Sequence, residues 1–244
     1  MQKLLKFCTG SIEVFDLDKI VAAHQPNYLP WIGYFHKILK SDVFIILDHV
    51  QFSRRGFINR NRVKGPKGAV WLTVPVRVHG TMRIMDVHID NTKKWNKKHA
   101  DTLKAFYAKA PYFEEVYPIL REVYELRWES LAEFNIEIIM RIVNMLDINR
   151  KFIRSSTLEL QGKKMDMIIE LCKKVGATVY FSGKGAMRYQ DPKVFEKNGI
   201  KLVYQEFEHP VYPQRFGDFV PNLSILDMLF NVGIKNTREI LKNL

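Results

Sequence analysis

Cysteine is scarce in this chain, and long apolar runs are absent. The 244 residues contain only Cys8 and Cys172, too few for a disulfide framework or a zinc cluster. No apolar run approaches the roughly 20 residues that a membrane span needs. Lys3 and Lys6 interrupt the first apolar stretch, so we expect no signal peptide. Together these absences predict a protein of the reducing cytoplasm.

Acidic residues are also few compared with basic ones. The chain has 26 Asp and Glu against 38 Lys and Arg, and its formal net charge is +12. Such an excess favours anionic partners, namely nucleotides, phosphorylated metabolites, nucleic acid or an acidic membrane surface. A generally lysine-rich surface explains the scattered lysines equally well. The exception is residues 54–67, which hold six basic side chains and no acidic one.

Two short apolar runs frame the most informative stretch of the chain. Residues 20–23 are apolar and lead to His24, and the β-branched, apolar residues 43–47 lead to Asp48. Between them, residues 30–40 carry apolar side chains at helical spacing. The pattern predicts a strand, a helix and a second strand parallel to the first. Its continuation predicts an α/β fold with a mostly parallel open sheet built from βαβ units.

Polar residues follow both of these strands. Parallel strands place their carboxyl ends at one edge of a sheet, and open α/β sheets bind their ligands there. We therefore expect a cleft at this edge. The first half of the chain would contribute to it His24, Gln25, Asn27, Tyr28, Asp48 and Gln51.

A second α/β unit is predicted in the C-terminal half. Its elements are residues 152–153 as an opening strand, a helix over 163–175 ending at Gly176, a buried strand over 178–181, a helix over 191–197, a strand over 201–207, and two helices over 224–231 and 236–243 with Ser224 and Asn236 as N-caps. The strand over 178–181 runs into Ser182-Gly183-Lys184-Gly185, where backbone N–H groups and a lysine suit an anion. The expected cleft therefore also receives Ser182, Gly183, Lys184, His209 and Asp227.

Between the two units the sequence predicts a basic loop, a β-hairpin and a helical insertion. The loop covers residues 51–68, and strands are expected over 70–78 and 84–89. Helices are expected from Thr92, with Asn91 as N-cap, to Ala110 and from Phe113 to Leu146, with Leu126 on a long apolar stripe; residues 92–146 would form a helical subdomain. The binding candidates in the loop are Asn59, Arg60, Asn61, Arg62 and Lys64.

Three interpretations of the basic loop stay open. Arginine forks and amides fit phosphate and carboxylate oxygens. The same composition, with Phe57 as a stacking surface, fits a groove for single-stranded nucleic acid. Gly65, Pro66 and Gly68 also fit a solvated hairpin tip. Because six uncompensated positive charges repel one another, we favour an anionic ligand over the solvated tip.

His24, Asp48 and His209 are the candidate catalytic residues. Two histidines and a carboxylate at one sheet edge can form an acid–base pair, with His24 as the general base and Asp48 as the group that orients it. A structural role is the alternative for each histidine. The chain shows no metal-ligand spacing, so we expect no metal; the cofactor is unknown, with a nucleotide or an acyl donor as options.

At this point the motifs resemble those of the WbqC-like protein family. They run in order along the chain from about residue 20 to the C-terminus, and they are His24-Gln-Pro-Asn-Tyr-Leu-Pro-Trp-Ile-Gly-Tyr-Phe-His-Lys-Ile38, Asp48-His-Val-Gln-Phe52, Asn59-Arg-Asn-Arg62, Trp71-Leu-Thr-Val-Pro75, Tyr180-Phe-Ser-Gly183 and Ser224-Ile-Leu-Asp-Met-Leu-Phe-Asn231. The leader, residues 1–18, lies outside the resemblance, and residues 19–244 are expected to form a single domain.

The resemblance implies a role in bacterial O-antigen or other surface-polysaccharide biosynthesis. It favours a transferase that modifies a nucleotide-linked amino sugar, for example by N-acyl or aminoacyl transfer, with the nucleotide sugar as the anionic partner. A weaker likeness to the His-x-Gly-His segment of nucleotidylyltransferases supports a related architecture. In this chain Tyr28 and Trp31 stand at the histidine positions and Pro30 at the glycine. Nucleotidylyl or adenylyl transfer, an RNA-binding module and a non-catalytic assembly protein are the alternatives.

Overall fold

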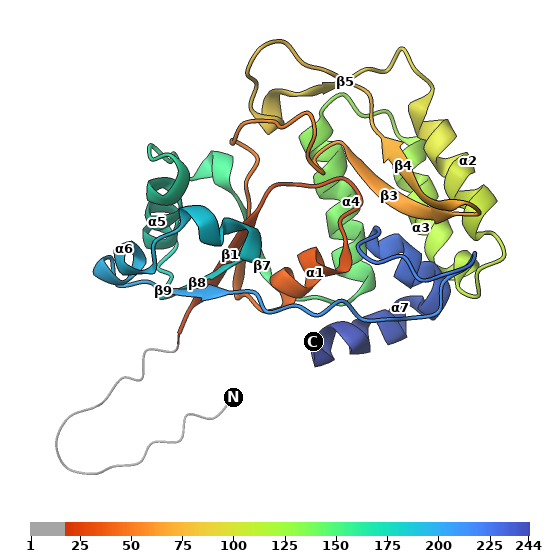
Figure 1. Cartoon of the computed structure of the whole chain (residues 1–244). Coiled ribbons are helices and arrows are strands. Elements are labelled where there is room, and N and C mark those ends of the chain that lie inside the picture. Colours follow the sequence, from red (N-terminus) through yellow and green to blue (C-terminus); the bar gives the residue numbers. More distant parts are fainter. Residues whose placement is uncertain (1–17) are drawn as a thin grey trace.

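The fold is organised around a parallel sheet of five strands. The computed structural model describes residues 18–244, so the expected leader lies outside the described residues except for Asp18. The sheet order is β7-β2-β1-β8-β9, and every neighbouring pair is parallel. The strands are β1 (Ile20–His24), β2 (Val43–Ile46), β7 (Lys151–Arg154), β8 (Val179–Ser182) and β9 (Lys201–Tyr204). The predicted α/β fold with a mostly parallel sheet is confirmed (Figure 1).

Helices cover both faces of this sheet, as the alternation of side chains along the strands requires. On one face, Ala22 and Phe44 belong to the core that contains α1 (Ile32–Leu39) and the helical insertion. On the other face, Val21 and Ile45 pack with helices α5 (Lys164–Lys174) and α6 (Pro192–Lys197). Strands buried on both faces read as continuous apolar runs, which is why the sequence revealed them.

The connection from β2 to β7 holds two small antiparallel pairs. They are β3 (Arg60–Gly65) with β4 (Gly68–Thr73), and β5 (Val76–Arg77) with β6 (His88–Ile89). The prediction that residues 51–68 are all loop is wrong, because Arg60–Gly65 form a strand. Its tight turn ends at Gly68, whose φ of 106° favours glycine. The expected strand over 70–78 is interrupted at Pro75, which has no N–H to donate, and the expected strand over 84–89 begins as a 3₁₀ turn, η1 (Ile84–Asp86).

The helical insertion consists of three helices rather than two. They are α2 (Trp95–Tyr107), α3 (Phe113–Glu125) and α4 (Leu131–Met145). The helical region expected from Phe113 to Leu146 is divided not at Pro118, which lies inside α3, but before Ser130, which begins a new helix and accepts a hydrogen bond from the Glu133 N–H at 3.4 Å. Leu126 is 52 % exposed in the break and does not join the apolar stripe. Asn91 is not the N-cap of α2; its side-chain amide donates to the Trp128 carbonyl at 2.8 Å.

The C-terminal helix α7 (Ile225–Asn243) is kinked at Gly233. The φ there is 83°, and a Cβ would lie 2.6 Å from the ring of Tyr112, so only glycine fits. Ser224 caps the helix as predicted, accepting from the Leu226 N–H at 3.3 Å. Asn236 is not an N-cap, because it lies inside the second half of the helix and donates to the Val232 carbonyl. No helix among residues 18–244 is both long and apolar enough for a transmembrane segment.

Candidate functional site

The carboxyl ends of β1 and β8 lie next to each other at the centre of the sheet. The strands pair in parallel, with Ala22 opposite Phe181, so the chain leaves both at the same edge. The sheet grows outward from β1 in one direction through β2 and β7, and in the other through β8 and β9. Doubly wound sheets bind ligands in the crevice where the direction reverses. The expectation that these two strand ends open into a common hollow is confirmed by a pocket that both line.

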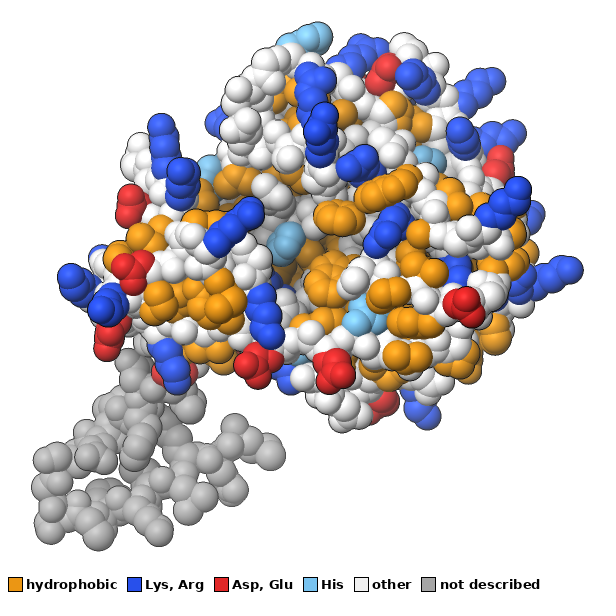
Figure 2. All heavy atoms as spheres, viewed as in Figure 1, with side chains coloured by type: hydrophobic (Ala, Val, Ile, Leu, Met, Phe, Trp, Pro, Cys, Tyr) orange, Lys and Arg blue, Asp and Glu red, His pale blue; other side chains and the backbone are white. Residues whose placement is uncertain are grey.

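The pocket has a volume of about 1130 Å³ and a strongly one-sided charge. Among the described residues that line it, no side chain is an aspartate or glutamate. Its cationic side chains are Lys37, Lys164, Lys184 and Arg188. Figure 2 shows a hollow near the centre of the molecule, with hydrophobic side chains and a histidine in it and basic side chains around it. Positive charges within low-dielectric walls favour an anionic ligand.

The indole of Trp31 forms an apolar wall of the pocket. It lies across Gly33, so closely that a Cβ at position 33 would come within 2.4 Å of the ring. Phe207 meets the indole edge to face, with 5.0 Å between ring centroids, and also lines the pocket. Flat aromatic surfaces of this kind suit a nucleobase or the apolar face of a sugar ring.

His24 lies in the pocket with one ring nitrogen engaged. Its Nδ1 is 3.1 Å from the carbonyl oxygen of Gln25, which can only accept, so Nδ1 carries the proton and Nε2 keeps its lone pair. Burial, followed by the charge of Lys37, lowers the pKa of His24 to about 3. The ring is therefore neutral at pH 7, and a bound anion would raise its pKa toward the range useful for a general base.

Five of the predicted site residues line the pocket, namely His24, Gln25, Ser182, Gly183 and Lys184. Ser182 is 2 % exposed and its hydroxyl lies 2.8 Å from Oε1 of Gln190, so it supports the turn more than it offers a free donor. Lys184 begins η3 (Lys184–Tyr189), a 3₁₀ segment with no buried residue, and it presents its charge at the mouth of the pocket.

The sequence prediction missed the polar residues on α1. Lys37 and Tyr34 line the pocket although they are only 5 % and 2 % exposed. Their helix is buried on nearly every side, because it lies between the sheet and α7. Amphipathic spacing alone does not mark a lysine on such a helix as buried. Arg188 and Lys164 were also missed, since each lies in a stretch where a solvated lysine or arginine is ordinary.

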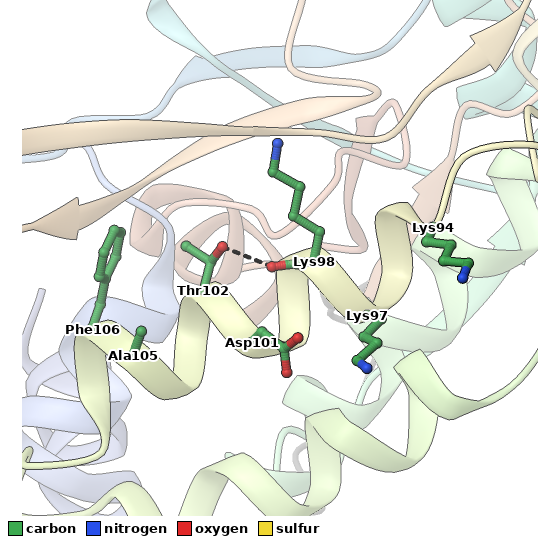
Figure 3. Close-up of a pocket in the computed structure, with 7 residues that line it drawn as sticks. All are labelled: Lys94, Lys97, Lys98, Asp101, Thr102, Ala105 and Phe106. Carbon is green, nitrogen blue, oxygen red and sulfur yellow. Dashed lines mark hydrogen bonds between the residues drawn. The ribbon is translucent and has the colours of Figure 1, made fainter.

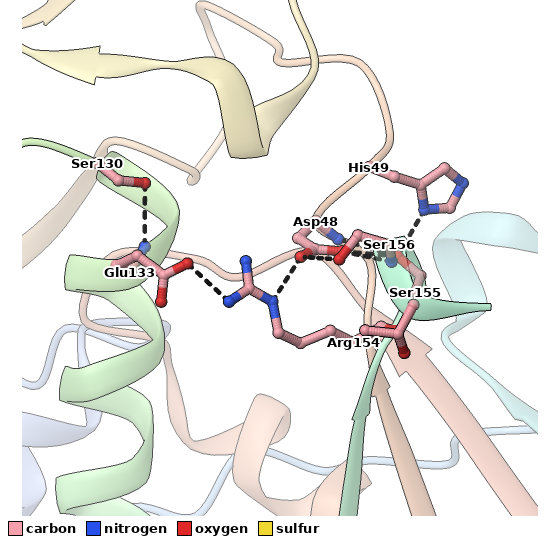
Figure 4. Close-up of polar contacts among 8 residues, drawn as sticks. Asp48, His49, Ser130, Glu133, Arg154, Ser155 and Ser156 are labelled. Atoms are coloured by element: carbon pink, nitrogen blue, oxygen red, sulfur yellow. Dashed lines mark hydrogen bonds and ion pairs between the residues drawn. The ribbon is translucent and has the colours of Figure 1, made fainter. Parts of the chain in front are cut away.

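Asp48 does not line the pocket, contrary to the prediction, but forms a buried polar junction (Figure 4). Its carboxylate accepts hydrogen bonds from Arg154 Nε at 2.7 Å, the Ser156 hydroxyl at 2.8 Å and the Ser156 N–H at 2.9 Å. Arg154 continues to Glu133 at 2.6 Å. Burial alone would raise the pKa of Asp48, but the bonds from Arg154 and Ser156 outweigh it and hold the pKa below its ordinary value. The junction ties β2 to β7 and α4.

Tyr28 is not a pocket residue either, because it is fully buried in the helical core. Its hydroxyl lies 2.8 Å from Nδ1 of His99 and 2.5 Å from the hydroxyl of Tyr124. Asn61 also serves the backbone of this segment and donates to the Leu29 carbonyl at 2.6 Å. The neighbouring motif residue Asn27 is buried and outside the pocket lining. Tyr28 and Asn61 thus hold the segment that follows β1 in place and do not contribute to the pocket.

Asp227 and Lys64 lie in a second buried polar cluster and not in the pocket. Asp227 accepts from the hydroxyls of Tyr107 at 2.7 Å and Tyr212 at 3.0 Å, and burial raises the pKa of its carboxyl. Lys64 is 1 % exposed and donates to Oε1 of Gln214 at 2.9 Å. The bonds of Asp227 join α7 to α2 and to the loop after β9, and the bond of Lys64 joins the hairpin to the same loop. Both residues therefore have a structural role that the sequence did not predict.

His209, Gln51 and Asn59 are likewise outside the pocket. His209 stacks on Trp31 with ring centroids 6.4 Å apart, and its two ring nitrogens are engaged by the Pro210 carbonyl and the Asn222 N–H. Gln51 is exposed, and Asn59 is buried and donates to the Val74 carbonyl at 2.9 Å. The predicted partnership of His24 and His209 as an acid–base pair therefore has no support in the placement of the two rings.

Arg60 and Arg62 lie on the hairpin beside exposed aromatic rings. The guanidinium of Arg60 is 4.5 Å, and that of Arg62 5.7 Å, from the centroid of Trp71. Trp71 is 44 % exposed, and Phe57 beside it is 47 % exposed and also lines the pocket. The basic loop thus does not close over the pocket, but its aromatic surface begins at the pocket wall.

A smaller basic hollow of about 440 Å³ lies along α2 (Figure 3). Its charged residues are Lys94, Lys97, Lys98 and Asp101. In Figure 3 the Lys98 side chain points toward the neighbouring strands, whereas Lys97 points away from them. Thr102 donates its hydroxyl to the Lys98 carbonyl at 2.7 Å. No sequence motif falls here, and the hollow serves below as a control for charge removal.

The described residues define an α/β protein with a doubly wound sheet and a cation-lined pocket at its carboxyl edge. No group of three or more His, Cys, Asp or Glu side chains in residues 18–244 is placed to hold a metal ion. Residues 25–239 match the sequence model of the WbqC-like protein family, and the chain belongs to this family.

One curated relative is the uncharacterized protein Rv1507c of Mycobacterium tuberculosis. It is 38 % identical over 219 residues, which cover 88 % of this chain and 94 % of the relative. No solved structure matches the chain, so the suggested likeness to nucleotidylyltransferases stays a prediction.

Proposed function

We propose that this protein is a transferase that binds a nucleotide-linked sugar in the central pocket and modifies the sugar. The observation that supports this proposal most is the lining of the pocket, which has four cationic side chains and no carboxylate among the described residues. A sugar nucleotide carries a diphosphate between two rings. The cations of the pocket suit the diphosphate, and the aromatic side chains of Trp31 and Phe207 suit a ring.

The size of the pocket also suits a two-substrate reaction. Ligand pockets usually measure about 300–1,000 Å³, and this one reaches about 1130 Å³. In an N-acyl transfer the amine of the sugar would lose its proton to a base as the new C–N bond forms. The donor's leaving group would depart with its bonding electron pair. His24, with a free Nε2 lone pair, is the proposed base, and the bound diphosphate would raise its pKa.

Membership of the WbqC-like family supports a place for this reaction in surface-polysaccharide biosynthesis. We propose an amino sugar as the acceptor and an acyl or aminoacyl group as the transferred group. Both substrates would then meet over the carboxyl ends of β1 and β8.

Calorimetric titration with uridine- and thymidine-diphosphate sugars tests the proposal. We expect the double variant Lys184→Ala, Arg188→Ala to lose at least about 100-fold in affinity, since each charged hydrogen bond to a phosphate contributes roughly 1.5–3 kcal/mol and the variant removes two of them. The charge-matched control is Lys94→Ala, Lys97→Ala in the hollow along α2, which should bind as the wild type does. Absence of sugar-nucleotide binding by the wild type contradicts the proposal.

The variant Arg60→Ala, Arg62→Ala separates the pocket from the basic loop. Neither arginine lines the pocket, so we expect the affinity for sugar nucleotides to change little. If this variant loses binding while Lys184→Ala, Arg188→Ala keeps it, the basic loop holds the nucleotide and the pocket assignment is wrong.

Binding of single-stranded RNA is the second candidate function. It is favoured by one observation, the exposed surface where Arg60 and Arg62 lie against Trp71 with Phe57 beside it, because stacking platforms flanked by cations bind unpaired bases. The measurement is the affinity for a short RNA as a function of salt. A steep salt slope, together with loss of binding in Trp71→Ala, would support RNA binding, and a flat response would exclude it.

A further inference from the structure

Lys37 is a buried lysine. It is 5 % exposed, and among residues 18–244 no carboxylate forms an ion pair with its ammonium. Burying an unpaired charge is costly, so lysines in such positions are normally paired. Burial lowers the pKa of Lys37 to about 8. The side chain lines the pocket, and the charge is therefore available to a ligand.

Gly183 leaves the approach to this ammonium open. A Cβ at position 183 would lie 3.4 Å from Nζ of Lys37. The φ of Gly183 is −77°, a value that any residue adopts, so the backbone does not require glycine here. What the glycine provides is space directly in front of the lysine, on the side that belongs to the turn after β8.

Tyr34 adds a second polar group. It precedes Lys37 by three residues on α1, so the two side chains share a face of the helix. Tyr34 is 2 % exposed, lines the same pocket, and its buried hydroxyl has no hydrogen-bond partner in the described residues. The ring of His24 lies against Tyr34, with 4.9 Å between centroids. A buried hydroxyl normally finds a partner, so two groups on one helix face are left for a ligand.

We propose that Lys37 and Tyr34 form an inner phosphate subsite, with the phosphoryl group seated in the space in front of Gly183. This assignment deepens the proposed function, on which it rests, by naming the residues that hold the diphosphate of the substrate. The ammonium and the phenol both donate, and a phosphoryl group offers only acceptors. The exposed cations Lys184 and Arg188 then hold the outer part of the diphosphate at the mouth of the pocket.

Inorganic pyrophosphate is the probe for this subsite, and calorimetric titration is the measurement. We expect Lys37→Met to lose about 10- to 100-fold in affinity for pyrophosphate, and Lys37→Arg to retain part of it. Lys37→Met should also unfold at the same or a higher temperature than the wild type, because it removes a buried charge. A residue that weakens binding when replaced, yet costs no stability, has a role in binding and not in the fold.

Gly183→Val provides an independent variant that keeps the lysine. Its side chain fills the space in front of Nζ, so we expect it to weaken pyrophosphate binding to a similar degree. Wild-type affinity in either Lys37→Met or Gly183→Val overturns the subsite.

The subsite and the proposed function can fail separately. If pyrophosphate binds through Lys37 but no sugar nucleotide binds, the subsite stands and the proposed function falls. If sugar nucleotides bind equally well to the wild type and Lys37→Met, the proposed function stands and the subsite is wrong.

Discussion

Replacing Asp48 distinguishes a structural residue from a catalytic one. In Asp48→Ala, the guanidinium of Arg154, the hydroxyl of Ser155 and both donors of Ser156 lose a carboxylate acceptor. Breaking a buried ion pair costs about 3–5 kcal/mol. Because the Arg154 side chain is 35 % exposed and keeps its bond to Glu133, we take the lower end, about 3 kcal/mol. Asp48→Asn keeps one acceptor oxygen and should cost about half as much.

The assay is urea unfolding followed by circular dichroism, with sugar-nucleotide affinity measured on the folded protein. Glu133→Ala is the control, since it removes only the 48 % exposed partner of Arg154 and should cost about 0.5 kcal/mol. We expect Asp48→Ala to lower the unfolding midpoint and leave the affinity of the folded molecules unchanged. An unchanged midpoint together with lost binding or turnover would refute the structural assignment and restore Asp48 to the site.

Three further predictions concern stability and the pocket wall. Burial lowers the pKa of His99 to about 4, whereas in the unfolded chain the pKa is about 6.5. The unfolded chain therefore takes up the proton first, and the free energy of unfolding should fall as the pH drops from 6.5 to 4. In urea unfolding, the wild type should lose about 2 kcal/mol more than His99→Gln between pH 7 and pH 5. Gly33→Ala should push the indole of Trp31 aside, which shifts the tryptophan fluorescence and weakens sugar-nucleotide binding. The control is Gly185→Ala, whose Cβ would have no atom within 4 Å, and its melting temperature should equal that of the wild type. Leu126→Ala should change the free energy of unfolding by less than about 0.5 kcal/mol, because the side chain is 52 % exposed; a larger loss would mean that Leu126 belongs to the core.

The sheet could be predicted because its strands form short, continuous apolar runs in the sequence. Apolar runs such as Val43–Ile46, buried on both faces, have no alternative location in a protein of this size. The antiparallel pairs and the break before Ser130 could not be predicted, because they depend on tertiary contacts. The strand Arg60–Gly65 has a polar sequence, and its lysine and asparagine are buried because α2, the loop after β9 and the segment after β1 supply their partners.

The position of the pocket could be predicted from the sequence, but only five of the residues that line it were among the predicted site residues. The strand ends at His24 and Ser182 mark the edge of the sheet, and this follows from topology alone. Polar residues near those ends can equally serve as internal hydrogen-bonding groups, as Asp48 and Tyr28 do, and the sequence does not separate the two uses. Lys37 was missed for the converse reason, since a lysine on a helix is usually solvated.

The central position of β1 has a consequence for biosynthesis of the chain. One of its edges pairs with β2, which follows after the single helix α1, but the other must wait for Val179–Ser182. While the ribosome translates the intervening segment, that edge presents free N–H and C=O groups to any passing strand. A nascent chain halted before residue 179 should therefore be prone to aggregate, and molecular chaperones would be needed until β8 has emerged.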